Sequence, residues 1–357
     1  MHILSFMSGS SLDGMDIGLI QISQKSNQYS YNIIQAQTIP YPPLWAEALK
    51  KMPSTSAEEL VKYDFDYSLF CAEHINEFVK NCNTKVDLIS FHGHTIFHNP
   101  DQHYTFALGN LSTLNALTEI QVLGDFRDMD VSLGGQGAPL MGIADKLLFD
   151  ENSINLNLGG ICNISVNAEK VVAFDICPCN QLYNNIYSKM GIEYDDRGDI
   201  SRKGLLNNEL FDDLNRHEFL NLSYPKSLDN NLISRDFIPM LDRDIPYEDI
   251  LRTITEFVAF QITQSITKLL NENLVKKGDS MLCSGGGAHH IFLQERIDQG
   301  IYHHKIIRAE TNDDLINYKE LVLMALLAYQ RKQGKVNVLE QFTGASKDTI
   351  SGGIYGK

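Results

Sequence analysis

The stretch HILSFMSGSSLDGMDIGLIQI, residues 2–22, contains two apolar segments separated by a polar turn. The apolar segments favour extended chain, and Gly9 and Gly14 allow a sharp reversal between them. The pattern therefore predicts a β-hairpin at the start of the chain. The elements expected next are a strand over 29–37, a long helix opened by a capping box of Ser56 and Glu59, and a strand over 86–91.

The same order of elements begins again in the stretch INLNLGGICNISV, residues 154–166. Two apolar segments again flank a glycine turn, here Gly159 and Gly160. The elements expected in this half are strands over 154–158, 162–166, 171–174 and 281–283 and helices over 246–270 and 313–333. There is no close sequence repeat, so the duplication is one of element order alone.

Length and composition predict a two-lobed α/β protein. With 357 residues, 43% of them hydrophobic and 21% charged, the chain is long for a single core and too apolar for extended disorder. We place an N-terminal lobe at 1–137, with 336–357 packing back on it, and a C-terminal lobe at 138–335. A cleft between the lobes is the expected ligand site.

Charge and cysteine usage limit the partners and the compartment. A net charge of -15 opposes binding to nucleic acid or to anionic membranes, which requires clustered Lys and Arg. Residues 2–7 enter an apolar strand without a charged leader, and no stretch is apolar enough to span a membrane. The six cysteines are scattered, as is typical of reduced thiols. We therefore expect a cytoplasmic protein.

Three glycine turns follow strands and could hold phosphate through backbone N–H groups. The first matches neither the Walker pattern nor the dinucleotide fingerprint, and ordinary packing turns are the alternative. Carboxylates beside the first turn, Asp13 and Asp16, are candidates for Mg²⁺. The candidate nucleotide-binding residues are Gly9, Ser10, Ser11, Asp13, Gly14, Asp16, Gly159, Gly160, Gly285, Gly286 and Gly287.

Asp175 ends the expected strand over 171–174, where a carboxylate can act as a general base at the edge of a sheet. Helix capping is the alternative role. Cys177 and Cys179 follow closely, but no second Cys or His pair completes a zinc site. Structural thiols are the favoured interpretation.

His92 and His94 stand two residues apart at a strand end, a spacing used by metal-dependent hydrolases. Hydrogen bonding to sugar hydroxyls suits them equally well. The dense charges of DFRDMD, residues 125–130, indicate a ligand-lined loop in which Arg127 could bind a substrate carboxylate, although a local Arg–Asp network is the commoner outcome.

Read together, these segments resemble the anhydro-N-acetylmuramic acid kinases, a branch of the sugar kinase, Hsp70 and actin superfamily. The resemblance runs nearly end to end. The segments that carry it are MSGSSLDGMD at 7–16, FHGHT at 91–95, DFRDMDVSLGGQGAPL at 125–140, NLGGICNIS at 157–165, FDICPCN at 174–180, CSGGGAHH at 283–290 and TGAS at 343–346.

The resemblance implies a two-lobed actin-like ATPase fold, made of duplicated RNase H-like units around a central cleft. It also implies a homodimer and a reaction with ATP and Mg²⁺. Water opens the 1,6-anhydro ring of the sugar, and O6 receives the γ-phosphoryl group to give N-acetylmuramic acid 6-phosphate in cell-wall recycling. By the same resemblance, the segment 9–16 meets the phosphates and Mg²⁺, Asp175 activates the water, and 285–287 lie near the nucleotide. The sugar-facing residues it implies are His92, Arg127, Asp130 and Glu320.

The sequence differs from the family pattern at four places. The family's SGTS is SGSS at 8–11, and its GPGN is CPCN at 177–180, with Cys177 and Cys179 in place of two glycines. The family's HGQT is HGHT at 92–95, with His94 in place of Gln, and its GD is GN at 109–110, with Asn110 in place of Asp. Two alternatives therefore stay open. One is a metal-dependent hydrolase that uses His92 and His94, and the other is a non-catalytic sugar or nucleotide sensor on the same fold.

Overall fold

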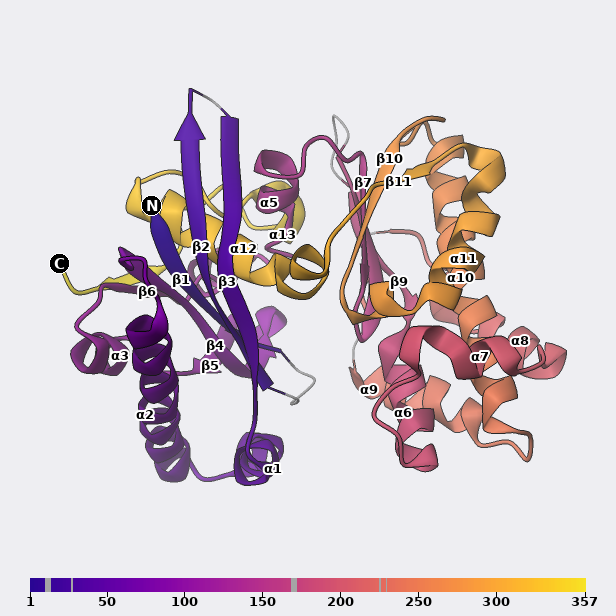
Figure 1. Ribbon diagram of the computed structural model, residues 1–357, viewed down its shortest axis with the longest axis horizontal. Helices are drawn as coiled ribbons and strands as arrows, with labels where there is room; N and C mark the ends of the chain where they lie inside the picture. Colours follow the sequence, from indigo (N-terminus) through magenta and orange to yellow (C-terminus); the bar gives the residue numbers. More distant parts are fainter. Residues whose placement is uncertain (10–13, 27, 168–171, 225, 229) are drawn as a thin grey trace. The chain divides into compact units, whose positions relative to one another are not determined.

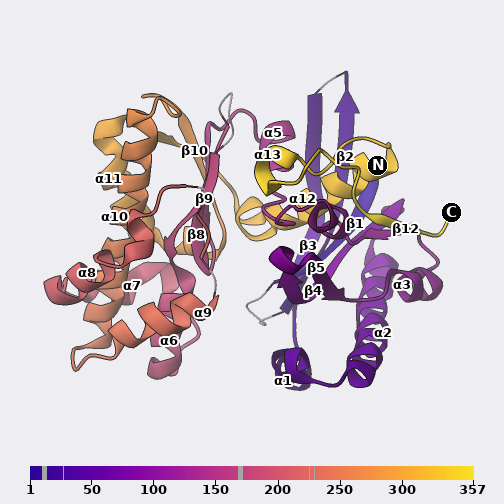
Figure 2. The same cartoon turned by 180° about the vertical axis from the view of Figure 1, so that it is seen from behind.

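A computed structural model describes residues 1–9, 14–26, 28–167, 172–224, 226–228 and 230–357. The chain divides into two units, of which unit 1 contains Met1–Phe149 and Tyr318–Lys357 and unit 2 contains Asp150–Asn317 (Figures 1 and 2). These bounds differ from the expected 1–137 and 138–335. The difference arises because the segments around residues 142 and 324 pack within unit 1: the Ser90 hydroxyl donates to the Met324 carbonyl (2.7 Å), and Gly142 lies against the Phe342 ring.

Unit 1 is built on a seven-stranded sheet with the order β12-β6-β4-β1-β2-β3, and β5 pairs with β4. Its strands are β1 (His2–Ser8), β2 (Gly14–Lys25), β3 (Gln28–Pro40), β4 (Leu88–Asn99), β5 (Tyr104–Leu108), β6 (Val122–Gly124) and β12 (Gly353–Tyr355). Its helices are α1 (Pro43–Lys51), α2 (Ala57–Asn81), α3 (Leu111–Thr118), α4 (Asp128–Ser132), α5 (Gly142–Leu147), α13 (Glu340–Thr343) and most of α12 (Asp313–Lys332). Figure 1 shows the yellow C-terminal segment returning to the strands of this unit, where β12 pairs antiparallel with β6.

The core of unit 1 forms where alternate strand residues face a helix. Phe6 and Phe91, on the parallel neighbours β1 and β4, stack with ring centroids 4.7 Å apart. Tyr67 and Ile75 of α2 are fully buried in the same cluster. The predicted capping box opens α2, because the Ser56 hydroxyl accepts from the Glu59 N–H and the Glu59 carboxylate accepts from the Ser56 N–H.

Unit 2 contains a five-stranded sheet with the order β11-β10-β7-β8-β9. Its strands are β7 (Ile154–Leu158), β8 (Ile161–Val166), β9 (Val172–Pro178), β10 (Ser280–Ser284) and β11 (Ile307–Arg308). Its helices are α6 (Asn180–Met190), α7 (Asp199–Lys203), α8 (Asn208–Asn215), α9 (Asn230–Leu232), α10 (Tyr247–Asn271), α11 (Ile291–Ile301) and the first residues of α12. The predicted strand over 171–174 is part of β9, although Val171 lies outside the described residues.

The two sheets share one topology. In unit 1, β1-β2-β3 form an antiparallel meander and β4 and β6 extend it by parallel pairing, first to β1 and then to β4. In unit 2, β7-β8-β9 and then β10 and β11 repeat this order and these directions. This repetition confirms the predicted duplicated RNase H-like fold. In the described part of the chain, no helix is both long and apolar enough to cross a lipid bilayer.

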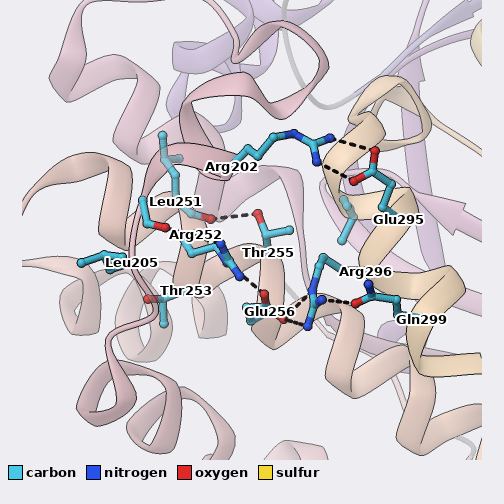
Figure 3. A network of polar contacts seen from close by, with 12 residues as sticks. Arg202, Leu205, Leu251, Arg252, Thr253, Thr255, Glu256, Glu295, Arg296 and Gln299 are labelled. Atoms are coloured by element: carbon cyan, nitrogen blue, oxygen red, sulfur yellow. Dashed lines mark hydrogen bonds and ion pairs between the residues drawn. The ribbon is translucent and has the colours of Figure 1, made fainter.

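A polar network joins three helices of unit 2 (Figure 3). Glu256 of α10 accepts from Arg252 of the same helix and from Arg296 of α11, each at 2.9 Å. Arg202 of α7 binds Glu295 of α11 through two bonds of 2.6 and 2.9 Å. The network therefore fixes α11, which begins just after the third glycine turn.

Candidate functional site

A pocket of about 190 Å³ in unit 1 brings together two of the predicted sugar-facing residues, His92 and Arg127. His92 is in β4, and Arg127 follows β6 at the start of α4. The two strands pair in parallel up to Phe91 and Gly124, so His92 and Arg127, which come shortly after these residues, meet where the pairing ends. The other polar residues that line the pocket include Asp64, Asn110, Asp125 and Asp128.

The Arg127 guanidinium is held from two sides. Its Nη1 donates to the Gly137 carbonyl at 2.9 Å, and its Nη2 lies 3.4 Å from His92 Nε2. Burial, the Arg127 charge and the nearby imidazoles of His94 and His98 lower the pKa of His92 to about 3. His92 is therefore neutral at physiological pH, and beside Arg127 it can accept a hydrogen bond from a guanidinium or from a sugar hydroxyl.

Three carboxylates in this pocket were not assigned by the sequence analysis. Restricted solvation and the neighbouring charges of Asp128 and Asp64 raise the pKa of Asp125 to about 6. Limited solvation of the carboxyl groups also raises the pKa of Asp64 and of Asp128. The dense charges after β6 indicated a ligand-lined loop but not which carboxylate faces a cavity, and Asp64 of α2 carries no sequence signal at all.

His94 has a different environment from His92. Its Nδ1 lies 2.8 Å from the Ser8 hydroxyl, which is 2.6 Å from the Tyr41 hydroxyl. Gly93 between the histidines has φ +70°, and a Cβ there would lie 2.1 Å from the Leu108 carbonyl oxygen. This left-handed residue breaks the regular alternation of the strand, so the two imidazoles contact separate protein partners.

Asp130, predicted to face the sugar, is fully buried. Its Oδ2 accepts from the Gly137 N–H at 2.7 Å, and its Oδ1 accepts from the Thr343 hydroxyl at 2.6 Å. The structure thus places Asp130 beneath the loop that holds Arg127, and both of its oxygens bind the protein.

Glu320 lies in α12, and its side chain is exposed. Crowding by surrounding atoms and the Asp16 carboxylate raise the pKa of Glu320, while Arg127 and Lys319 lower it. Asp16 of β2 accepts a hydrogen bond of 2.6 Å from the Thr38 hydroxyl. Unit 1 therefore brings Asp16, Glu320 and Arg127 into one electrostatic neighbourhood.

The first glycine turn is only partly described. Gly9 follows β1 and Gly14 begins β2, whereas Ser10, Ser11 and Asp13 lie outside the described residues. A Cβ at Gly14 would come within 2.6 Å of the Ile39 carbonyl oxygen, so the close approach of β3 requires glycine there.

In unit 2, Asp175 lies in β9 opposite Asn163 and is half-buried. Its Oδ2 accepts from the Leu228 N–H at 2.8 Å and from the Ser227 hydroxyl at 3.1 Å. Burial raises the pKa of Asp175, and these bonds oppose that rise. A carboxylate with a raised pKa is a better proton acceptor, which is the property a general base needs.

The second and third glycine turns of the chain, at 159–160 and 285–287, both belong to unit 2 and pack against each other. Gly285 has φ +82°, and a Cβ there would lie 2.4 Å from Asn157 Oδ1. The carbonyls of Gly159 and Gly160 accept from the N–H groups that begin α6, with bonds of 3.0 Å from Asn180 and from Cys179. The predicted turns therefore share one end of this sheet, a setting in which backbone N–H groups can bind an anion.

Comparison with known proteins identifies the family. A model of the family described as "Anhydro-N-acetylmuramic acid kinase" matches residues 1–357. A relative of that name from Aliivibrio fischeri is 31% identical over 370 residues, which cover 99% of this chain and 98% of the relative. The chain belongs to the anhydro-N-acetylmuramic acid kinase family. One from Haemophilus influenzae is 29% identical over 384 residues, covering 100% of this chain and 98% of the relative.

Among solved structures, the chain is similar to component A of the (R)-2-hydroxyglutaryl-CoA dehydratase of Acidaminococcus fermentans. The TM-score is 0.46 with 12% identity, and the match covers 93% of this chain and 99% of that one. The assignment to the anhydro-N-acetylmuramic acid kinase family depends on the sequence matches alone.

The structure gives a local explanation for the departure from the family pattern at Asn110 and none for the one at Cys179. Cys179, the N-cap residue of α6, has φ -132° and ψ -100°, which is neither the helical nor the extended conformation. The Asn110 side chain accepts from the Thr113 N–H at 3.0 Å and caps α3, a role that aspartate also fills. The change from Asp to Asn at position 110 therefore keeps the cap of α3.

Membership of the anhydro-N-acetylmuramic acid kinase family does not favour the hydrolase or the sensor alternative. Within the described residues, no three His, Cys, Asp or Glu side chains gather in a way that could hold a metal ion. His92 contacts Arg127, and His94 contacts Ser8, as expected for imidazoles used in hydrogen bonding.

Proposed function

We propose that this protein is an ATP-dependent kinase that hydrolytically opens 1,6-anhydro-N-acetylmuramic acid and phosphorylates O6. The observation that carries the proposal is the family match over residues 1–357, together with relatives of that name that align nearly end to end. The products are N-acetylmuramic acid 6-phosphate and ADP.

In this mechanism, Asp175 takes a proton from water as the water oxygen attacks the anomeric carbon of the sugar. The bond between that carbon and O6 breaks, and O6 attacks the γ-phosphorus of ATP while the bond to the β-phosphate oxygen breaks. The raised pKa of Asp175 supports its role as the base. The bonds from Leu228 and Ser227 both go to Oδ2, so they orient the carboxylate.

The remaining roles follow the chemistry of the residues. The turns at 159–160 and 285–287 lie at one end of the unit 2 sheet and bind the nucleotide, with Gly286 and Gly287 in the third turn, because the Gly285 N–H already donates to the Ile316 carbonyl. By the family resemblance, the segment 9–16 also meets the phosphates. MgATP enters as the substrate, and the carboxylate oxygens of Asp16 and Asp13 are of the kind that Mg²⁺ prefers. Arg127 and His92 bind the sugar, and Glu320 lies in the same neighbourhood.

We further propose that the protein works in cell-wall recycling in the cytoplasm, as a homodimer. All six cysteines are free thiols, which suits a reducing compartment. Sedimentation equilibrium of the purified protein at micromolar concentration tests the dimer, and a single species of monomer mass contradicts it.

The central experiment incubates the protein with MgATP and a panel of 1,6-anhydro-sugars. We expect ADP release that depends on the anhydro-muramic sugar, with a product heavier by one phosphoryl group and one water in mass spectrometry. Release of ADP at the same rate without any sugar, or no release with any member of the panel, contradicts the proposal.

The role of Asp175 is tested by Asp175→Asn. Because the variant removes the base but keeps the shape of the side chain, we expect turnover to fall about 10²- to 10⁴-fold with ATP affinity nearly unchanged. Asp244→Asn, which changes an exposed carboxylate of the same unit, is the matched control. Near-normal turnover of Asp175→Asn removes Asp175 from this role.

A further inference from the structure

The segment TGAS at 343–346 is not used by the proposed mechanism, yet the fold brings it against the loop before Gly137. The Gln136 N–H donates to the Thr343 carbonyl at 2.7 Å, and the Ser346 N–H donates to the Leu133 carbonyl at 3.1 Å. The Thr343 side chain is 2% exposed, and its hydroxyl donates to Asp130 Oδ1 at 2.6 Å. A C-terminal segment is therefore hydrogen-bonded to a loop some 200 residues earlier in the chain.

An unbroken series of hydrogen bonds runs from Thr343 to the pocket. Asp130, fully buried, accepts from Thr343 with one oxygen and from the Gly137 N–H with the other, at 2.7 Å. The Gly137 carbonyl in turn accepts from Arg127 Nη1 at 2.9 Å. Gly137 thus binds Asp130 through its N–H and Arg127 through its carbonyl oxygen.

The loop has little room for any other arrangement. A Cβ at Gly135 would lie 2.2 Å from Asp130 Oδ2, and Gly137 has φ +63°, which favours glycine. The Nε of Arg127 is buried and has no hydrogen-bond partner among the described residues, so none of them fixes the guanidinium through this atom. The orientation of Arg127 therefore depends on Gly137 and on the longer contact to His92.

We propose that Thr343 and Asp130 are positioning residues that orient Arg127 through Gly137 and thereby set the affinity for an anionic sugar. A guanidinium binds a carboxylate well only when its fork is correctly aimed, so loss of the Thr343 hydroxyl weakens sugar binding without touching the sugar. The inference rests on the proposed function only for the identity of the ligand.

The kinetic test compares Thr343→Val, which removes the hydroxyl but keeps the shape, with Thr343→Ser, which keeps it. We expect Thr343→Val to raise KM for the anhydro-muramic sugar about tenfold, with kcat and KM for ATP within about twofold, and Thr343→Ser to restore the wild-type value. Thr349→Val is the matched control, because Thr349 is buried in the same segment but pairs with the Ser351 hydroxyl.

A double-mutant cycle separates positioning from general loss of structure. If Thr343 acts through Arg127, Thr343→Val adds no further rise in KM to Arg127→Ala. Additive effects of the two substitutions, or a fall in kcat and both affinities together, overturn the proposal.

A measurement that does not depend on enzyme activity tests the role of Thr343 independently of the proposed function. The rate at which phenylglyoxal modifies Arg127, followed by peptide mass spectrometry, reports how firmly the guanidinium is held. We expect a several-fold faster rate in Thr343→Val than in the wild type and in Thr349→Val, whether or not any anhydro-sugar is phosphorylated. Equal rates in the three proteins overturn it.

Discussion

At the scale of single residues, His92 and His94 make the stability of unit 1 depend on pH. The pKa of His92 is lowered to about 3 and that of His94 to about 4, chiefly by burial, whereas an unfolded imidazole has a pKa of about 6.5. Below pH 6.5 the unfolded chain binds protons that the folded protein excludes. Stability therefore falls as the pH falls from 6.5 toward 4, by up to about 1.4 kcal/mol per pH unit for each histidine.

The corresponding prediction concerns His92→Gln. Because this variant removes one of the two groups, we expect the loss of unfolding free energy between pH 6.5 and pH 5 to be smaller than in the wild type. Urea unfolding at several pH values measures it, with the exposed His303→Gln as the control. The same pH dependence in His92→Gln as in the wild type contradicts the prediction.

The sequence indicates which residue types gather at the site but not how each one is used. Arg127 lies beside His92 because β4 and β6 pair in parallel through Phe91 and Gly124, and the hydrophobic pattern predicts a strand over 86–91 but not this pairing. Asp64 could not be predicted, because its Oδ1 meets the Gly109 N–H (2.7 Å) only after α2 packs on the sheet. The burial of Asp130 likewise depends on Thr343, a contact that no local pattern encodes.

At the scale of elements, the first turn of α3 is stabilised by its cap. The side-chain Oδ1 of Asn110 accepts from the Thr113 N–H, so Asn110→Ala leaves that N–H without its partner. We expect Asn110→Ala to lower the free energy of unfolding by about 1 kcal/mol and Asn110→Asp to leave it nearly unchanged. Urea unfolding checks both, and equal destabilisation by Ala and Asp would show that the cap is not the cause.

Helix α12 shows where prediction of elements from sequence stops. The pattern predicts one helix over 313–333, and the structure has Asp313–Lys332, but Tyr318 has φ -120° and ψ 17° and interrupts it. No proline or glycine marks this position, so local propensity gives no indication of the break. Tyr318 is also the first residue of the returning part of unit 1, which only the packing of the chain reveals.

At the scale of the whole molecule, the two units differ in whether they are formed by one stretch of chain or by two. Unit 2 is one continuous stretch with its own core, which includes Ile254 and Leu269 of α10 and Met281 of β10. Unit 1 is discontinuous, because α12 and β12 reach its sheet after the chain has completed unit 2. Residues 321–328 of α12 are all buried, so a fragment that ends at Phe149 leaves the apolar surface they cover exposed to water.

This difference predicts how fragments fold. We expect 150–317 alone to unfold cooperatively, and 1–149 alone to bind a dye for apolar surface and to lack a cooperative transition. Joining Phe149 to Tyr318 by a short glycine-serine linker should restore cooperative unfolding, since Lys319 Nζ lies 4.7 Å from the centre of the Phe149 ring and 3.0 Å from Asp145 Oδ1. Calorimetry of the three proteins measures this. A cooperative transition in 1–149 alone would mean that α12 and β12 are not needed for the first unit to fold.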